Sequence, residues 1–71
     1  MAELLQKLNE RGIQVLKQTE REYLLELDYV IEIEGNELFK LLQNGYVIAP
    51  FDDIDELCDF ILMDKQLHEK G

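Results

Sequence analysis

The sequence has few of the residues that crosslink or activate very small proteins. Its 71 residues include one cysteine, one histidine, one proline and no tryptophan. A single cysteine, Cys58, excludes an internal disulfide, and with one histidine, His68, it cannot complete a Cys/His zinc site. We therefore expect no metal and no other cofactor, and we expect the stability to come from packing or from self-association.

Basic residues are also scarce. Only 7 lysines and arginines accompany 16 aspartates and glutamates, which gives a net charge of −9. A surface with this charge repels nucleic acids and anionic membranes. We expect no direct nucleic-acid binding and no membrane binding, whereas basic protein partners would be attracted.

Long hydrophobic runs and a signal peptide are missing as well. The first residues, MAELLQKL, lack the basic segment and apolar run of a secretion signal. No stretch approaches the roughly 18 uninterrupted apolar residues of a membrane-spanning helix. A lone cysteine in such a chain predicts a cytoplasmic location. Because 46% of the residues are nevertheless hydrophobic and periodic, we expect one small acidic domain over residues 1–71.

The stretch Tyr23–Glu34, YLLELDYVIEIE, alternates between two kinds of side chain. Its odd positions are all apolar. Because a strand sends successive side chains to opposite faces, the pattern predicts one long strand with an apolar face over a core. The twelve residues exceed the usual strand length, and Leu27-Asp28-Tyr29 is a candidate bulge. The even positions form a second, mostly acidic face: Leu24, Glu26, Asp28, Val30, Glu32 and Glu34.

Leucine spacing predicts two short helices outside this stretch. The first covers Ala2–Arg11 and ends at Gly12, a natural residue for the left-handed conformation after a helix. The second covers Glu37–Asn44, is capped at Asn36 and closes at Gly45.

A longer helix is predicted from Ile54 to about Glu69. Asp53 as N-cap places Glu56 at the third helical position, which is a capping-box arrangement. This helix has more apolar residues than one buried stripe requires. The surplus forms a second stripe that could cover the first helix or pair two copies of the chain: Phe60, Met63 and Leu67.

Two further strands complete the predicted fold. Ile13–Thr19 should pair with the long strand through an odd-numbered loop, which places Val15 opposite Leu27. Tyr46–Phe51 is a third strand, in which Pro50 indicates an edge. The predicted fold class is a small α+β domain in the order α-β-β-α-β-α, with a three-stranded, mainly antiparallel sheet and the helices packed on one face.

No arrangement of residues in the sequence indicates catalysis. His68 lies near the end of the last helix among charged residues, where we expect it to be solvated. Cys58 is expected to be a small buried residue, because the neighbouring Asp55 and Asp59 disfavour its thiolate. The protein is therefore predicted not to be an enzyme.

The acidic residues are concentrated in two segments that contain no basic residue. Residues 22–34 contain five acids and residues 52–64 contain six, which together make 11 of the 16. The simple interpretation is a solvated surface, with the helix acids favoured near a helix N-terminus. The functional interpretation is a partner-binding acidic face formed by Glu26, Asp28, Glu32, Glu34, Asp52, Asp53, Asp55, Glu56 and Asp59.

Three functions fit these observations. The leading prediction is a non-enzymatic interaction or regulatory protein that binds a basic protein partner, through the acidic face. The first alternative is an acidic nucleic-acid mimic that inhibits a DNA- or RNA-binding protein. The second alternative is a structural homodimer whose apolar interface is the stripe of Phe60, Met63 and Leu67.

Overall fold

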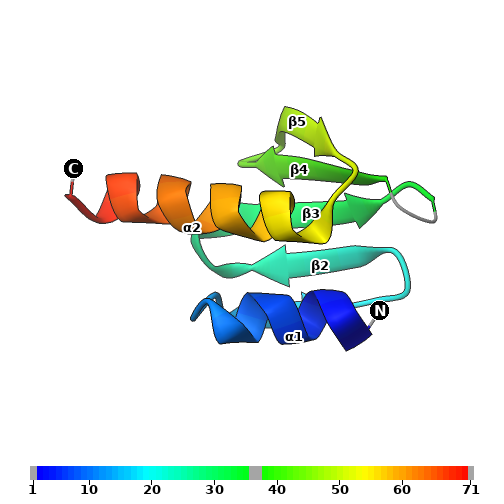
Figure 1. The fold of residues 1–71 in the computed structure, drawn as a ribbon. Coiled ribbons are helices and arrows are strands. Elements are labelled where there is room, and N and C mark those ends of the chain that lie inside the picture. The colour runs from blue at the N-terminus through cyan, green and yellow to red at the C-terminus, as the bar shows by residue number, and fades with distance from the viewer. Residues whose placement is uncertain (1, 36–37, 71) are drawn as a thin grey trace.

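The computed structural model describes residues 2–35 and 38–70. It contains one antiparallel sheet, with one helix before it in the chain and another helix after it (Figure 1). Five strands lie side by side in their sequence order, and each pairs antiparallel with the next. The α+β class is confirmed, but the sheet has five strands instead of the predicted three. The elements are α1 (Ala2–Glu10), β1 (Val15–Gln18), β2 (Glu22–Leu25), a 3-10 turn η1 (Glu26–Asp28), β3 (Tyr29–Ile33), β4 (Phe39–Gln43), β5 (Tyr46–Phe51) and α2 (Ile54–Lys70).

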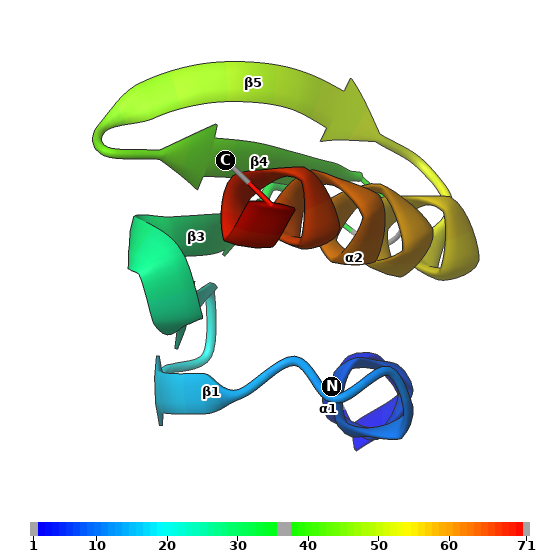
Figure 2. The same cartoon turned by 90° about the vertical axis from the view of Figure 1, so that its left-hand side faces the viewer.

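Both helices lie on the same face of the sheet, and β5 curves over α2 (Figure 2). We call this side the covered face. Side chains of the two helices and of the covered face form one hydrophobic core, in which each member is at most 1% exposed. Its members are Leu4, Leu8, Ile13, Tyr23, Leu25, Tyr29, Ile31, Phe39, Leu41, Leu57, Cys58 and Ile61.

The stretch predicted as one long strand is a hairpin. β2 and β3 are joined by η1, in which Leu27 and Asp28 have positive φ angles of 59° and 64°. Across the hairpin, Tyr23 pairs with Ile31. The odd-numbered residues of β2 therefore pair with odd-numbered residues of β3, and their apolar side chains still face the core. Leu27 is the exception, because it lies in the turn and is 46% exposed.

The predicted helix over Glu37–Asn44 is wrong. Asn36 and Glu37 lie outside the described residues, and the following segment is β4. Asn44 and Gly45 form the turn to β5 with φ angles of 54° and 84°. Two consecutive residues with positive φ are what a tight two-residue hairpin turn requires, and Asn-Gly is the preferred sequence for it. The element order is therefore α-β-β-β-β-β-α.

The predicted register of the first strand is also wrong. Val15 pairs with Leu25 instead of Leu27, because Leu27 is in the turn and belongs to no strand. The register then shifts between Val15 and Lys17, which indicates a bulge in this edge strand. In the β1–β2 turn, the hydroxyl oxygen of Thr19 accepts hydrogen bonds from the backbone N–H groups of Arg21 and Glu22.

The two terminal helices and the last strand agree with the sequence-based predictions. α1 ends one residue before the predicted boundary, and Gly12 has a φ of 73°. The Asp53 carboxylate accepts hydrogen bonds from the backbone N–H groups of Asp55 and Glu56, at 2.8 and 3.3 Å, which begins α2 as predicted. β5 lies at the edge of the sheet and contains Pro50. Within the described ranges, no helix is long and apolar enough to cross a membrane.

Candidate functional site: the open face of the sheet

The acids at the start of α2 meet the basic residues of α1. Lys7 Nζ lies 3.3 Å from Asp55 Oδ1, and Arg11 Nε lies 2.7 Å from Asp59 Oδ1. A further contact of 3.3 Å joins Arg11 to Asp55. The hydrogen bonds to these carboxylates raise the pKa of Lys7 and the pKa of Arg11. Of the predicted acids at the start of α2, Asp55 and Asp59 are therefore paired with basic residues within the molecule.

The predicted acidic strand face forms only in part, because Glu26 and Asp28 lie in η1 and not in a strand. Glu26 Oε2 accepts a 2.8 Å hydrogen bond from the backbone N–H of Gln14 and lies 3.2 Å from Lys65 Nζ. The hydrogen bond from Gln14, followed by the contact with Lys65, lowers the pKa of Glu26. Glu34 pairs with Lys40 at 2.7 Å. The sequence could not show these pairings, since each joins residues from different elements.

Several of the predicted acids form no ion pair, although Glu32 lies opposite Lys40 and helps to raise the pKa of Lys40. Among the residues that the structure describes, no ion pair reaches Glu32 or the carboxylate of Glu22, which lies opposite it across β2 and β3. The same holds for Asp53, which caps α2. The other unpaired members of the predicted face are exposed and scattered over a turn and the start of α2: Asp28, Asp52 and Glu56.

The face of the sheet opposite the helices has an apolar row that crosses four strands. Leu24 of β2 pairs with Val30 of β3, Val30 pairs with Leu42 of β4, and Leu42 pairs with Val47 of β5. Directly opposite residues lie on the same side of a sheet, so the four side chains are neighbours. The first three are half-buried, and Val47 is 56% exposed. Both α1 and α2 lie on the other face of the sheet, so neither of them covers this row (Figure 2).

A second row runs beside the apolar row on the same side. Glu22 pairs with Glu32, Glu32 pairs with Lys40, and Lys40 pairs with Pro50. Like charges directly opposite one another are unfavourable in a sheet, and Lys40 is already bound to Glu34. We call the two rows together the open face. Of its residues, the sequence-based prediction placed Leu24, Val30 and Glu32 on one face, whereas the register was needed to add the residues of β4 and β5.

Two shallow hollows lie along the open face. The first has a volume of about 290 Å³, and Leu16, Leu24 and Val30 contribute apolar side chains to its lining. The second has a volume of about 330 Å³ and is lined in part by Arg21, Glu22 and Glu32. An apolar hollow and an acidic hollow therefore adjoin the two rows, which gives the face both an area for apolar contact and an area that favours cations.

The predicted dimer stripe on α2 is divided between the core and the surface. Phe60 packs on Phe51, with ring centroids 5.5 Å apart and planes tilted by 49°. Met63 and Leu67 are exposed by 62% and 65%. Phe60 thus packs against the core within one chain, and the two exposed residues alone remain for an intermolecular contact.

A polar cluster that the sequence did not predict joins the end of α2 to the sheet. The buried Tyr29 donates its hydroxyl hydrogen to Asp64, and His68 Nε2 lies 3.4 Å from the same Asp64 oxygen. Burial, and then the hydrogen bond to Asp64, raises the pKa of Tyr29. His68 is 53% exposed, and the Tyr29 side chain is fully buried. The cluster fastens the helix to the sheet and offers no exposed phenolate.

The single cysteine has the inert environment predicted from the sequence. Cys58 is fully buried, and burial raises the pKa of its thiol to about 11. Because the thiolate is the reactive form, this thiol is unreactive at neutral pH. In the part of the chain covered by the structure, no three His, Cys, Asp or Glu side chains form a group that could hold a metal ion.

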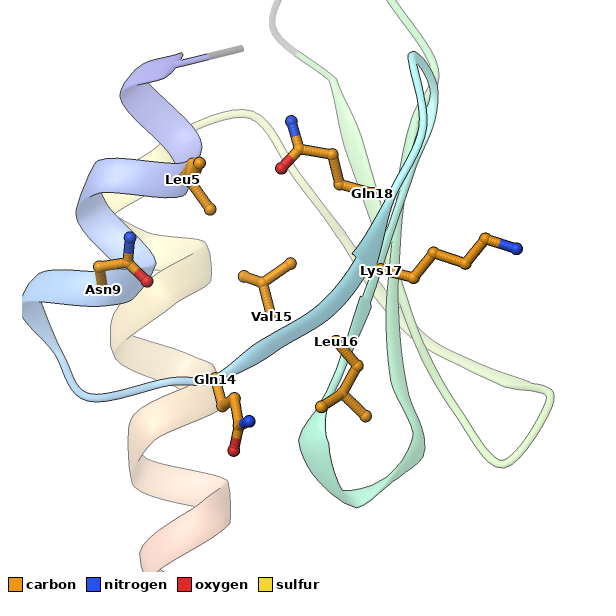
Figure 3. Close-up of a pocket in the computed structure, with 7 residues that line it drawn as sticks. All are labelled: Leu5, Asn9, Gln14, Val15, Leu16, Lys17 and Gln18. Atoms are coloured by element: carbon orange, nitrogen blue, oxygen red, sulfur yellow. The ribbon is translucent and has the colours of Figure 1, made fainter.

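A groove of about 420 Å³ separates α1 from β1. Figure 3 shows Leu5 and Val15 pointing toward each other across it, whereas Lys17 points away. Its remaining lining residues are uncharged: Asn9, Gln14, Leu16 and Gln18. The groove therefore lacks a charged group that would select a partner, in contrast to the open face.

Comparison with known proteins adds no family assignment. The chain matches no protein-family model, no curated protein and no solved structure.

Proposed function

We propose that this protein is a non-enzymatic binding protein that uses its open face to hold a basic segment of a protein partner. The observation that carries the proposal is the apolar row of Leu24, Val30, Leu42 and Val47 in register beside Glu22 and Glu32, which form no ion pair in the described part of the chain. Apolar contact provides affinity, and complementary charge provides orientation and a fast association.

The partner segment needs both apolar and basic side chains. Apolar side chains would cover Val30 and Leu42, which are only half-buried in the free protein. A lysine or arginine would lie between Glu22 and Glu32, where it would relieve the repulsion between the two carboxylates. The net charge of −9 would attract such a segment over a longer range, and salt would weaken that attraction.

The experiment is affinity capture from the native lysate with four tagged proteins. The first is the wild type, the second carries Leu42→Ser, and the third carries Glu22→Gln with Glu32→Gln. We expect a basic protein to be retained by the wild type at low salt and lost from both variants. Met63→Ser is the matched control, because Met63 is an exposed apolar residue on α2, away from the open face. It should retain the partner.

Purified partner and protein then give the affinities. Each open-face variant should weaken binding by about tenfold or more, which corresponds to about 1.4 kcal/mol. A partner that binds all four proteins equally would contradict the proposal, as would a partner lost only with Met63→Ser. The nucleic-acid mimic stays a prediction, but the acidic ladder on one strand that motivated it is not formed.

A further inference from the structure

One segment of this acidic chain contains no charge. The eleven residues from Leu41 to Phe51 lack Asp, Glu, Lys, Arg and His, although charged residues make up 32% of the sequence. The segment includes all of β5, which is an edge strand. Three consecutive β5 residues are exposed: Tyr46 by 78%, Val47 by 56% and Ile48 by 38%.

An exposed, uncharged edge strand is unusual because its free backbone groups can pair with another strand. Proteins normally protect such an edge with charged residues, short strands, bulges or proline. The opposite edge of this sheet has several of these devices: β1 has four residues, a register shift and an exposed lysine, Lys17. On β5, Pro50 protects only the end of the strand and the register shifts at Ile48, but the first four residues, Tyr46–Ala49, have no charged side chain.

We propose that β5 pairs antiparallel with β5 of a second copy of the chain and forms a symmetric dimer. A two-fold axis between the edges would extend each five-stranded sheet into one continuous sheet of both protomers. Pro50 has no N–H group, so the pairing is centred on Tyr46–Ala49. The exposed apolar side chains of Val47 and Ile48 would be covered by the same residues of the partner copy.

The charge distribution selects a second copy as the occupant. Two molecules that each have a net charge of −9 repel, and they can approach most closely where neither presents an acid. Antiparallel pairing also keeps the nearest acids apart. The residues after β5, Asp52 and Asp53, would lie beside the uncharged Asn44-Gly45 turn of the partner copy. No carboxylate would then face another across the strand pair.

Sedimentation equilibrium of the full chain over a wide concentration range tests this inference. We expect twice the monomer mass at high concentration, and tighter association at higher salt, because salt screens the repulsion between the protomers. Ile48→Glu should weaken the association by about tenfold or more, since it places carboxylates close together in the strand pair. Leu16→Glu, at an exposed leucine of the other edge strand, is the matched control and should leave the dimer intact.

Amide hydrogen exchange provides a second readout that needs no variant. Residues 46–49 should gain protection as the concentration rises, while the backbone of β1 should not. A monomer at every concentration would overturn the inference. So would a dimer that survives Ile48→Glu and is lost with Met63→Glu, because that dimer would use α2. The salt dependence separates this inference from the proposed function, since partner binding at the open face weakens with salt while the dimer strengthens.

Discussion

The two faces of the sheet are built from alternate residues of the same strands, yet they have opposite properties. Leu41 is fully buried under the helices, whereas its neighbour Leu42 is half-buried on the open face. On the covered face, Tyr23 and Ile31 form an apolar pair. Their neighbours in the sequence, Glu22 and Glu32, form a pair of like charges on the open face. The burial of the covered face stabilises the fold. The apolar row and the like-charged pair of the open face are not needed for that stability.

The largest expected effect separates the two adjacent leucines. Leu41→Ala should lower the free energy of unfolding by about 3 kcal/mol, because it leaves a cavity in a closed core. Leu42→Ala should cost about 1 kcal/mol or less, since much less surface is buried there. Urea denaturation of both variants measures the difference. If both variants lost the same free energy of unfolding, Leu42 would be as buried in solution as Leu41, which would contradict the difference between the two faces.

The next effect concerns the end of the covered face where α2 is fastened. Tyr29→Phe should lower the free energy of unfolding by about 1–2 kcal/mol, because Asp64 loses the hydrogen bond from a buried hydroxyl. Tyr46→Phe is the matched control at an exposed position, and its stability should equal that of the wild type within error. If Tyr29→Phe is as stable as the wild type, the hydroxyl has no role in fastening the helix.

A smaller effect depends on pH and involves Glu26, which links α2 and the loop after α1 to the sheet. Its pKa is lowered in the folded state, so its charge stabilises the fold above the unfolded pKa of about 4.3. That contribution is lost as the pH falls through the lower, folded pKa. Glu26→Gln should therefore cost about 1 kcal/mol at neutral pH and progressively less in acid.

Urea denaturation at several pH values measures this dependence. Glu20→Gln, at an exposed acid outside the helices for which the structure describes no ion pair, is the control and should change the stability little at any pH. A loss for Glu26→Gln that stays constant down to low pH would show that the charge of Glu26 is not responsible.

The smallest effect should be a gain on the open face. Glu22→Gln should raise the free energy of unfolding by about 0.3 kcal/mol at low salt, because it removes the repulsion from Glu32 directly opposite. Added salt should abolish the gain. Thermal unfolding measures the gain. The control is Glu20→Gln, which replaces an exposed acid in the β1–β2 turn. If Glu22→Gln were destabilising, Glu22 would have a structural role and would not be free to bind a partner.

The sequence predicted those parts of the fold whose signals are local. The capping carboxylate of Asp53 marked the start of α2, and Gly12 marked the end of α1. The hairpin of β2 and β3 was missed because its turn contains Leu27 in the left-handed conformation, where glycine or asparagine is usual. The Asn44-Gly45 turn had a usable signal, but the spacing of Leu38, Leu41 and Leu42 fits a helix as well as a strand.

The candidate site was less predictable than the fold. Leu24, Val30 and Glu32 of the predicted even face lie on the open face, but the rest of that face depends on the pairing of β3 with β4 and of β4 with β5. The pairing of α2 acids with Lys7 and Arg11 was equally hidden, because it joins segments more than 40 residues apart. Charge runs read along a chain therefore overstated the acidity of the folded surface.

The sequence by itself determined which side chains of α1, β2, β3 and α2 would face the core, whereas Leu27, predicted to do so, is exposed in η1. Alternation within residues 23–33 and helical spacing in α1 and α2 reflect local backbone geometry, and this geometry persists whether or not a strand folds back on itself. Only the tertiary structure decided which residues became neighbours on the open face and at the β5 edge. Strand register, turn conformation and contacts between distant segments set those neighbours, and they depend on the free energy of the whole fold rather than on any one stretch.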